Sequence, residues 1–328
     1  MKNTTIKDVA KKAEVSVTTV SRVLNNRGYI SDEMKDKVMK AVDELNYTPN
    51  EIARSFFTNE TKFIALIIPT TKNPYFGELT FHIEKLLAQN GYNLFICNSL
   101  NDIKNEKKYL KLLKERRVDG IIVGSHNIDI SEYKNLENKI VSIEREITQE
   151  IPIIQSDNYL GGELATKELI NNSCKSILCV VGDKNILTPA NDRSEAYRKV
   201  VSEHGLKSNI IEIPFNYSFD KKIEIIKSIL LTEKYDGVFA GDDVMAKLFI
   251  NAAKDLGIEI PKKLKVIGFD GTEMIRLLNP EISTIRQPID LLAKGAVEAL
   301  INLINGREVE KQIIYPVELI SSNTTRLT

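Results

Sequence analysis

The sequence has few of the features that mark secreted or membrane-bound proteins. Its 328 residues include three cysteines, Cys97, Cys174 and Cys179, an odd number without CxxC spacing, which indicates reduced thiols rather than a disulfide framework. No apolar run approaches the roughly 20 residues that a membrane-spanning helix needs. The N-terminal MKNTTIKDVA also lacks the apolar core of a signal peptide. We therefore expect a cytoplasmic protein that has no membrane partner.

Short motifs of several enzyme classes are also missing. No G-x-G-x-x-G follows the first apolar run, FIALIIP, and Gly161-Gly162 does not replace it, which argues against a nicotinamide dehydrogenase. There is no Walker A sequence, and His82, His126 and His204 form no set with a serine and an aspartate. We expect no enzyme, and neither a cofactor nor a metal.

The formal net charge is zero, which argues against a nonspecific nucleic-acid coat, but the N-terminal part differs from the average. Residues 1–31 carry six Lys or Arg side chains against two carboxylates. This local excess of positive charge is a modest electrostatic footprint for DNA.

The same N-terminal stretch has the pattern of two short helices joined by a tight turn. Ile6, Val9, Ala10 and Ala13 follow helical spacing, and Ser16 is a good N-cap for a second helix. In that helix the apolar side chains point inward and small or polar ones outward, among them Val17, Thr18, Ser21 and Arg22. A third apolar stripe, from Met34 to Leu45, begins after the N-cap candidate Ser31. This pattern indicates a helix-turn-helix, although periodicity alone fits a generic helical hairpin equally well.

From Phe63 onward the pattern changes to alternating strands and helices. FIALIIP is an unbroken apolar run, which is typical of parallel strands. The alternation runs to about residue 157, restarts at Tyr159 and continues to KVIGFDG at 265–271. A strand and a long helix follow, and two strands separated by Pro316 close the chain. We predict an all-α helix-turn-helix head at 1–60 and, at 61–328, an α/β core of two doubly wound parallel-sheet lobes.

The residues of the head carry a specific resemblance. TIKDVAKKA-x-VS-x-TTVSRVLN and SDEMKDKVMKAVDELNYTPNEIARSF resemble the DNA-binding region of the lactose-repressor (LacI/GalR) family, without a gap from Thr5 to about Phe57. The resemblance implies a homodimer that binds palindromic operator DNA. It also implies a core of the periplasmic sugar-binding type, with one lobe at about 61–157 and 288–315 and the other at about 158–287 and 316–328. SHNID, SDNYLGGELA and GFDGT…STIRQPID look closest to sucrose-operon and ribose-operon repressors.

This resemblance implies a DNA-binding surface on the head. Val17, Thr18 and Arg22 would read base edges, and a guanidinium suits Arg22 to guanine because it can bond to O6 and N7 together. Side chains with hydroxyl or amide groups would contact phosphates, namely Ser16, Thr19, Ser21, Asn25, Tyr29 and Ser31. Thr5, Asn50 and Ala53 complete the implied set.

The resemblance also implies a hinge helix and exposes one departure from the family. The hinge helix would span about Asn50 to Phe57 and insert Phe56 into the minor groove. The family usually has glycine in the turn where this chain has Glu14. A residue other than glycine with positive φ there would cost about 1–2 kcal/mol, so the turn is either strained or shifted.

Ligands of open α/β sheets bind beyond the carboxyl ends of the strands. The residues expected there combine carboxylates, guanidinium groups, amides and aromatic rings, which suit sugar hydroxyls and the CH face of a sugar ring. They match sugar-binding positions of the family: Asn73, Tyr75, Phe76, Glu144, Arg145, Arg193, Phe219, Asp242, Asp270 and Gln287. Plainer interpretations stay open, with Asp242 as a helix N-cap, Asp270 as a turn residue, and Tyr75 and Phe76 as packing residues.

Together these features predict a repressor of a sugar-utilisation operon that a sugar or sugar phosphate releases from its operator. An exported sugar-binding protein would explain the core but neither the head nor the missing signal peptide. A catabolite-control regulator that uses a phosphorylated protein as corepressor remains an alternative.

Overall fold

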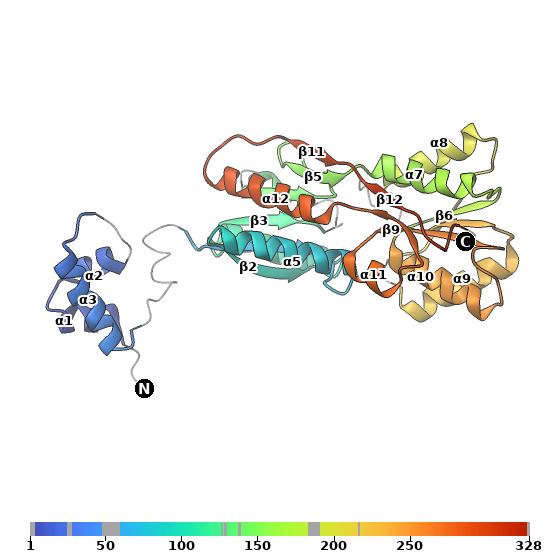
Figure 1. Ribbon diagram of the computed structural model, residues 1–328. Helices are drawn as coiled ribbons and strands as arrows, with labels where there is room; N and C mark the ends of the chain where they lie inside the picture. The colour runs from blue at the N-terminus through green and yellow to red at the C-terminus, as the bar shows by residue number, and fades with distance from the viewer. Residues whose placement is uncertain are drawn as a thin grey trace. The chain divides into compact units, whose positions relative to one another are not determined.

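The computed structural model describes residues 4–24, 28–47, 60–125, 127, 130–136, 139–182, 191–215 and 217–326. The chain divides into two compact units, Met1–Thr61 and Lys62–Thr328, which we call the head and the core. Figure 1 shows the helices and strands of both units. Among the described residues, no helix is both long and apolar enough to span a membrane.

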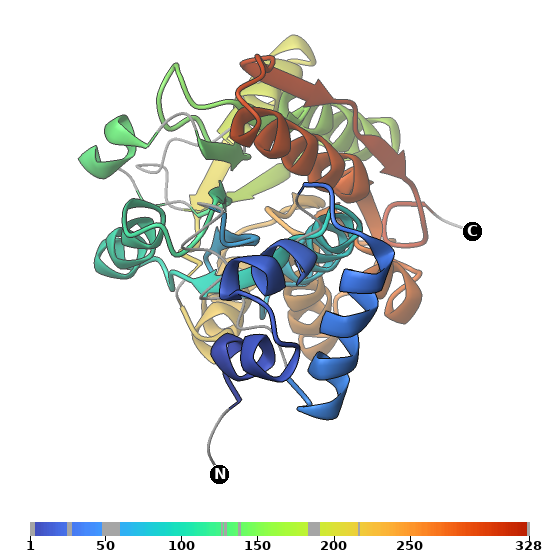
Figure 2. The same ribbon diagram turned by 90° about the vertical axis from the view of Figure 1, so that its left-hand side faces the viewer.

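The head consists of helices packed around one small apolar centre. These are α1 (Ile6–Lys12), α2 (Val17–Leu24) and α3 (Asp32–Glu44), drawn in blue in Figure 2. Each helix contributes a fully buried valine to the centre, namely Val9, Val20 and Val38. The inward positions predicted from helical spacing are therefore confirmed, and so is the helix-turn-helix.

Both predicted N-caps of the head are present. The Ser16 hydroxyl accepts a hydrogen bond from the Thr19 backbone N–H at 3.0 Å, and the Ser31 hydroxyl accepts one from the Met34 N–H at 3.4 Å. A side-chain acceptor at this position satisfies one of the N–H groups that the first turn of a helix leaves unpaired. The two caps explain why α2 and α3 begin where they do.

The turn between α1 and α2 is not shifted. Glu14 has a φ of +51°, in the left-handed region where the family usually has glycine. Its carboxylate lies 3.2 Å from the Lys37 ammonium group, but this ion pair is exposed and stabilises the turn by at most about 1 kcal/mol. Glu14 therefore adopts the backbone conformation that glycine usually has in this turn, and its backbone is strained there.

The first lobe of the core is built on a six-stranded sheet of order β11-β5-β4-β3-β1-β2, in which all neighbours are parallel. Its strands are β1 (Phe63–Ile68), β2 (Asn93–Asn98), β3 (Gly120–Val123), β4 (Ile140–Ile143), β5 (Ile153–Ser156) and β11 (Gln312–Tyr315). Helices α5 (Pro74–Gln89) and α12 (Ile289–Ile304) share one apolar cluster with β1, while α6 (Ile103–Lys114) and the short helix η1 (Ser131–Asn135) share another. Alternate residues of β1 supply the two clusters, so both faces of the sheet are covered.

The second lobe repeats this arrangement with order β12-β10-β9-β8-β6-β7. Its strands are β6 (Ile177–Val181), β7 (Asn209–Glu212), β8 (Gly237–Phe239), β9 (Lys265–Asp270), β10 (Ser283–Arg286) and β12 (Glu318–Ile320). Helices α7 (Asn158–Asn171) and α8 (Asn191–Glu203) share one apolar cluster, and α9 (Phe219–Thr232) and α10 (Asp243–Asp255) share the other. The predicted doubly wound lobes are confirmed, except that β12 runs antiparallel to β10. The short helix α11 (Glu273–Leu278) was not foreseen.

The chain passes between the lobes at three places: after β5, after β10 and after β11. These crossings are hydrogen-bonded to one another. The Asp157 N–H donates to the Tyr315 carbonyl at 2.7 Å, and the Ser156 hydroxyl donates to the Gln287 side-chain oxygen at 2.7 Å. The lobes are therefore joined along a single polar seam.

We expect Glu14→Gly to stabilise the head relative to Glu14→Ala, by about 1 kcal/mol. Both substitutions remove the ion pair with Lys37, so the difference between them reports the backbone strain alone. Hydrogen exchange of the α1 and α3 amides in the full chain measures this difference in stability. We expect about fivefold slower exchange in the glycine variant than in the alanine variant. Equal exchange in the two variants would contradict the strain at residue 14.

Candidate binding cavity and nucleic-acid interface

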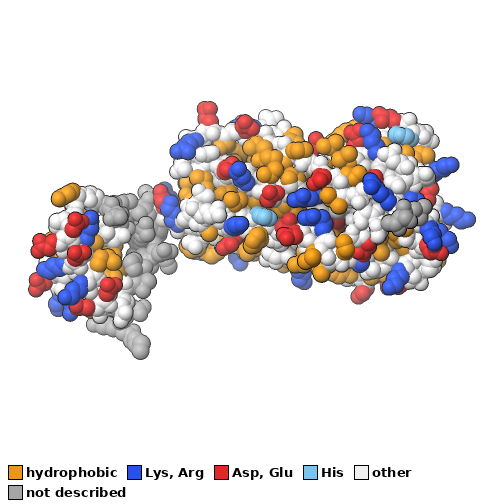
Figure 3. Space-filling model, viewed as in Figure 1, with side chains coloured by type: hydrophobic (Ala, Val, Ile, Leu, Met, Phe, Trp, Pro, Cys, Tyr) orange, Lys and Arg blue, Asp and Glu red, His pale blue; other side chains and the backbone are white. Residues whose placement is uncertain are grey.

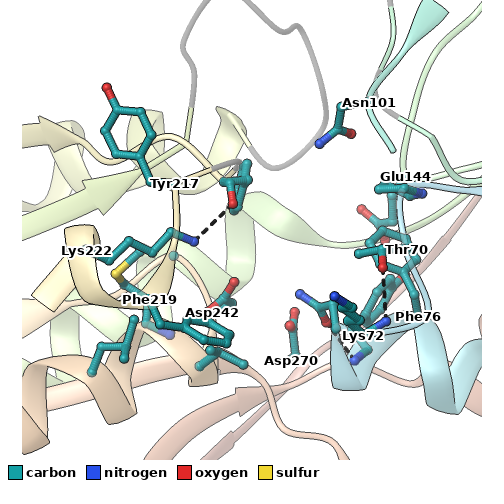
Figure 4. A pocket seen from close by; sticks show the side chains of 18 of the residues that line it. Thr70, Lys72, Phe76, Asn101, Glu144, Tyr217, Phe219, Lys222, Asp242 and Asp270 are labelled. Carbon is teal, nitrogen blue, oxygen red and sulfur yellow. Dashed lines mark hydrogen bonds between the residues drawn. The ribbon is translucent and has the colours of Figure 1, made fainter. Parts of the chain in front are cut away.

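A cavity of about 610 Å³ lies between the lobes of the core, a size that suits a small ligand. Figure 4 shows Thr70, Phe76 and Glu144 on one side of it and Tyr217, Phe219, Lys222 and Asp242 on the other. Nine of the ten predicted ligand positions line this cavity: Asn73, Tyr75, Phe76, Glu144, Arg193, Phe219, Asp242, Asp270 and Gln287. The carboxyl ends of the strands therefore bring residues far apart in the sequence to one place.

Arg193 is held firmly at the second-lobe side of the cavity. Its Nε–H donates to the Asn158 side-chain oxygen at 2.7 Å, and its Nη1 donates to the Gly241 carbonyl at 3.0 Å. The guanidinium also lies 3.4 Å from the centre of the Phe269 ring, within cation–π range. A Cβ at Gly162 would come within 2.4 Å of the Arg193 carbonyl oxygen, so glycine is required there for α7 and α8 to pack this closely.

Three carboxyl groups lie around this guanidinium, of which Glu144 and Asp270 are buried and Asp242 is half-buried. Burial raises the pKa of Glu144 and of Asp242, and it raises the pKa of Asp270 well above its ordinary value, while the Arg193 charge opposes each shift. Burial in turn lowers the pKa of Arg193 itself. A carboxyl group whose pKa is raised holds its proton more readily, so it can either donate to a sugar hydroxyl or accept from one.

Hydrogen bonds orient two of these carboxyl groups. The Glu144 carboxylate accepts from the Ser156 N–H at 2.5 Å and from the Asn158 amide at 2.7 Å. Asp270 accepts from the Gln287 side-chain amide at 2.7 Å. Glu144 and Asp270 have φ values of +54° and +100°, which are uncommon for these residue types. Strained residues of this kind gather where a fixed side-chain position matters more than stability.

The plainer interpretations of Asp242 and Tyr75 have different outcomes. Asp242 caps α10, since its carboxylate accepts from the Met245 N–H at 2.6 Å, and it lines the cavity as well. Tyr75 packs in the first lobe and is 6% exposed, yet its hydroxyl has no hydrogen-bond partner among the described residues. Packing alone explains the ring but not this hydroxyl, because leaving a buried polar group unpaired costs about 1–3 kcal/mol.

Arg145 is not part of the cavity wall. Its guanidinium is buried in the first lobe, where Nη1 lies 3.2 Å from the Glu106 carboxylate and donates to the Ser125 carbonyl at the same distance. Glu144 and Arg145 directly follow β4, and the side chain of Glu144 lines the cavity whereas that of Arg145 does not. The predicted effector contact of Arg145 is thus replaced by a buried ion pair.

Several lining residues were missed by the sequence analysis. They include polar and aromatic side chains from loops and from α9: Thr70, Lys72, Asn101, Phe215, Tyr217 and Lys222. Lys222 donates to the Phe215 carbonyl at 3.1 Å, although a lysine on an amphipathic helix usually indicates a solvated face. No short motif marks these positions, because the loops that carry them are brought together only by the fold.

On the head, the predicted base-reading residues lie on the outer side of α2. Val17, Thr18 and Arg22 are exposed, whereas Val20 and Val23 of the same helix are buried. The residues predicted to contact phosphates are exposed or partly exposed where described, and Tyr29 is almost fully exposed. Thr5 is exposed at the start of α1. Asn25, Asn50, Ala53 and Phe56, with the predicted hinge helix, lie outside the described residues.

Family models match both units of the chain. Residues 5–50 match "Bacterial regulatory proteins, lacI family", and residues 166–325 match "Periplasmic binding protein-like domain". A sucrose operon repressor of Pediococcus pentosaceus is 39% identical over 97% of this chain and 98% of its own length. A ribose operon repressor of Halalkalibacterium halodurans is 37% identical over 98% of this chain and 97% of its own length.

Solved structures show the same architecture. A periplasmic binding protein/LacI transcriptional regulator of Alkaliphilus metalliredigens, complexed with D-xylulofuranose, is 34% identical, with a TM-score of 0.74 over 81% of this chain and 100% of its own. The lac repressor dimer bound to operator and the anti-inducer ONPF has a TM-score of 0.85 over 99% of both chains, and at 23% identity this likeness shows the fold alone. The full-length relatives, together with the match of the head, establish that the chain belongs to the lacI family of bacterial regulatory proteins.

Proposed function

We propose that the protein is a sequence-specific repressor of a sugar-utilisation operon and that a sugar bound in the cavity releases it from operator DNA. The observation that carries the sugar assignment is the buried Tyr75 hydroxyl beside the charged groups of the cavity. All four groups line the cavity, and burial together with the Glu144 and Asp270 charges raises the pKa of Tyr75 well above its ordinary value, while the Arg193 charge opposes the shift. A ligand hydroxyl at this point would both pair the Tyr75 hydroxyl and bond to the carboxyl or guanidinium groups.

The charges of the wall favour an unphosphorylated sugar over a sugar phosphate. Its cations, Lys72, Arg193 and Lys222, are outnumbered by its acidic groups, Glu144, Asp220, Asp242 and Asp270. Two of the cations already donate to backbone carbonyls, Lys222 to Phe215 and Arg193 to Gly241. A phosphate group would add roughly two negative charges to this acidic cavity. The aromatic rings along the wall offer contact to the CH face of a neutral sugar ring.

The relatives support the same assignment. Those matched along nearly their whole length are named sucrose operon repressor and ribose operon repressor, and a solved relative at 34% identity is complexed with D-xylulofuranose. These names favour an effector-controlled operon repressor over a catabolite-control regulator with a phosphoprotein corepressor. The proposal assigns the chain no enzymatic step and places it in the cytoplasm with its operator.

A homodimer is the assembly that this function needs, because one short reading helix buries little surface on DNA. The core offers a surface for it. Figure 3 shows apolar side chains gathered on one face of the core, over α5, α11 and α12. Large apolar residues are exposed on α5 and α11, namely Phe81, Met274, Leu277 and Leu278. An exposed apolar surface of this kind is typical of a protein–protein interface.

We expect Arg22→Ala to weaken operator binding by about 1–3 kcal/mol, because a bidentate contact to guanine is lost. Operators selected from random duplexes, and scrambled duplexes of equal length, would be titrated with both proteins at one salt concentration. The loss should be confined to the selected sequence and to one base pair of each half-site. An equal loss on every duplex would identify Arg22 as a phosphate contact instead.

We expect Tyr75→Phe to weaken sugar binding by about 1 kcal/mol, roughly fivefold, without destabilising the sugar-free protein, because an unpaired buried hydroxyl is removed. The sugar is first found by thermal-shift screening of sucrose, ribose, D-xylulose and their phosphates, and the unphosphorylated compounds are expected to bind. Calorimetry and thermal unfolding then compare the two proteins.

Tyr197→Phe is the matched control for this prediction. The Tyr197 hydroxyl is buried in the second lobe, where it donates to the Ile177 carbonyl at 2.7 Å and accepts from the Asn209 N–H at 2.9 Å. Its removal should lower stability and leave sugar affinity unchanged. If Tyr75→Phe behaves like this control, the Tyr75 hydroxyl does not contact the sugar.

A further inference from the structure

We infer that Asn158 is a positioning residue for sugar recognition: its side-chain amide holds the Arg193 guanidinium of the second lobe in register with the Glu144 carboxylate of the first. This inference rests on the proposed function of the cavity. Asn158 is the first residue of α7 and follows the crossing from β5 directly. In the sequence it belongs to the SDNYLGGELA stretch that resembles sucrose-operon and ribose-operon repressors, but its spacing from neighbouring residues does not indicate a role for it.

The hydrogen bonds of Asn158 use both ends of its amide. Its Nδ2 donates to the Glu144 carboxylate at 2.7 Å and to the Ser156 carbonyl at 3.0 Å. Its Oδ1 accepts from the Arg193 Nε–H at 2.7 Å. Only 2% of the residue is exposed, so water does not compete for these bonds. A side chain here must donate toward a carboxylate and accept from a guanidinium, which is what a carboxamide does.

Asn158 does not itself line the cavity, whereas Arg193 and Glu144 both do. It therefore acts on a ligand through these two neighbours. The Arg193 guanidinium has five N–H groups, and the bonds to Asn158 and Gly241 use its Nε and Nη1 ends. With those ends held, the remaining N–H groups keep a defined direction for a sugar hydroxyl. Without Asn158 the guanidinium would keep its contact with the Phe269 ring and its hydrogen bond to Gly241, and it could turn on the face of the ring about that one bond.

The same amide also connects the two lobes. Glu144 follows β4 of the first lobe, and Arg193 belongs to α8 of the second. Any movement that separates these two residues must break a bond of Asn158 on one side or the other. The position of the sugar-binding guanidinium is thereby linked to the arrangement of the lobes, which is the element that a repressor must change on binding its effector.

A double-mutant cycle on sugar affinity tests this role. The variants are Asn158→Ala, Arg193→Lys and the pair, measured by calorimetry with the tightest binder among sucrose, ribose and D-xylulose. Arg193→Lys keeps the charge but lacks the Nε–H. We expect Asn158→Ala to weaken sugar binding about tenfold in the natural chain but less than about twofold in the Arg193→Lys variant. The effects of substitutions at residues that act together are not additive. If the two substitutions instead weakened sugar binding by independent factors that multiply in the double variant, the proposal would be overturned.

A second measurement does not depend on any sugar. With 15N-labelled arginine, the Nε–H signal of Arg193 is identified by its loss in Arg193→Lys. We expect Asn158→Ala to shift this signal and to speed its exchange with solvent. Asn158→Asp keeps the acceptor for the Nε–H but loses the donor to Glu144, so we expect it to keep the exchange slow. An unchanged signal in Asn158→Ala would overturn the proposal. If the Arg193 signal changes in Asn158→Ala but none of the tested sugars binds the natural chain, the proposed function is contradicted. The positioning of Arg193 by Asn158 would then still hold.

Asn209→Ala separates positioning from general destabilisation. The Asn209 side-chain amide donates to the Ile177 and Lys207 carbonyls, and the residue does not line the cavity. This variant should lower the melting temperature while sugar affinity and the Arg193 signal stay unchanged. If Asn158→Ala shows only that pattern, its role is merely structural.

Discussion

The polar seam at the three chain crossings constrains everything else in the core. Asp157 is bonded to Tyr315 and Ser156 to Gln287, so the crossings hold one another in place. Lobes joined in this way can rotate about the seam, but they cannot move apart independently. The cavity lies between the lobes, and Gln287 of the seam is part of its wall. A ligand that contacts both lobes therefore acts directly on the element that can move.

The charged groups of the cavity are held there at a cost in free energy. Withdrawing charged groups from water is unfavourable unless each is hydrogen-bonded, and the buried Glu144 and Asp270 and the half-buried Arg193 are all bonded to neighbouring side chains. A hydrophobic interior would stabilise the lobes more simply. Such a cluster has shifted pKa values and a tyrosine hydroxyl that finds no partner in the described part of the chain, which is typical of a binding site rather than of a structural core.

The sequence predicted what depends on local pattern. The apolar run FIALIIP becomes β1, the apolar stripe from Met34 to Leu45 lies on α3, and Glu14 has the positive φ that the missing glycine implied. One misplaced residue, Arg145, and one overlooked residue, Asn158, both make contacts with residues distant in the sequence. Arg145 meets Glu106, which lies 39 residues away, and Asn158 meets Arg193 across 35 residues. Spacing and periodicity carry no information about such pairs, because only the completed fold brings them together.

Linkage between sugar and operator is the central claim, and it is reciprocal by thermodynamic necessity. The most direct test measures operator affinity with and without saturating sugar, and sugar affinity with and without saturating operator, on the same full-length protein. The account predicts that sugar weakens operator binding and that operator weakens sugar binding by the same factor. Sugar affinity that is identical in the presence and absence of operator would contradict it.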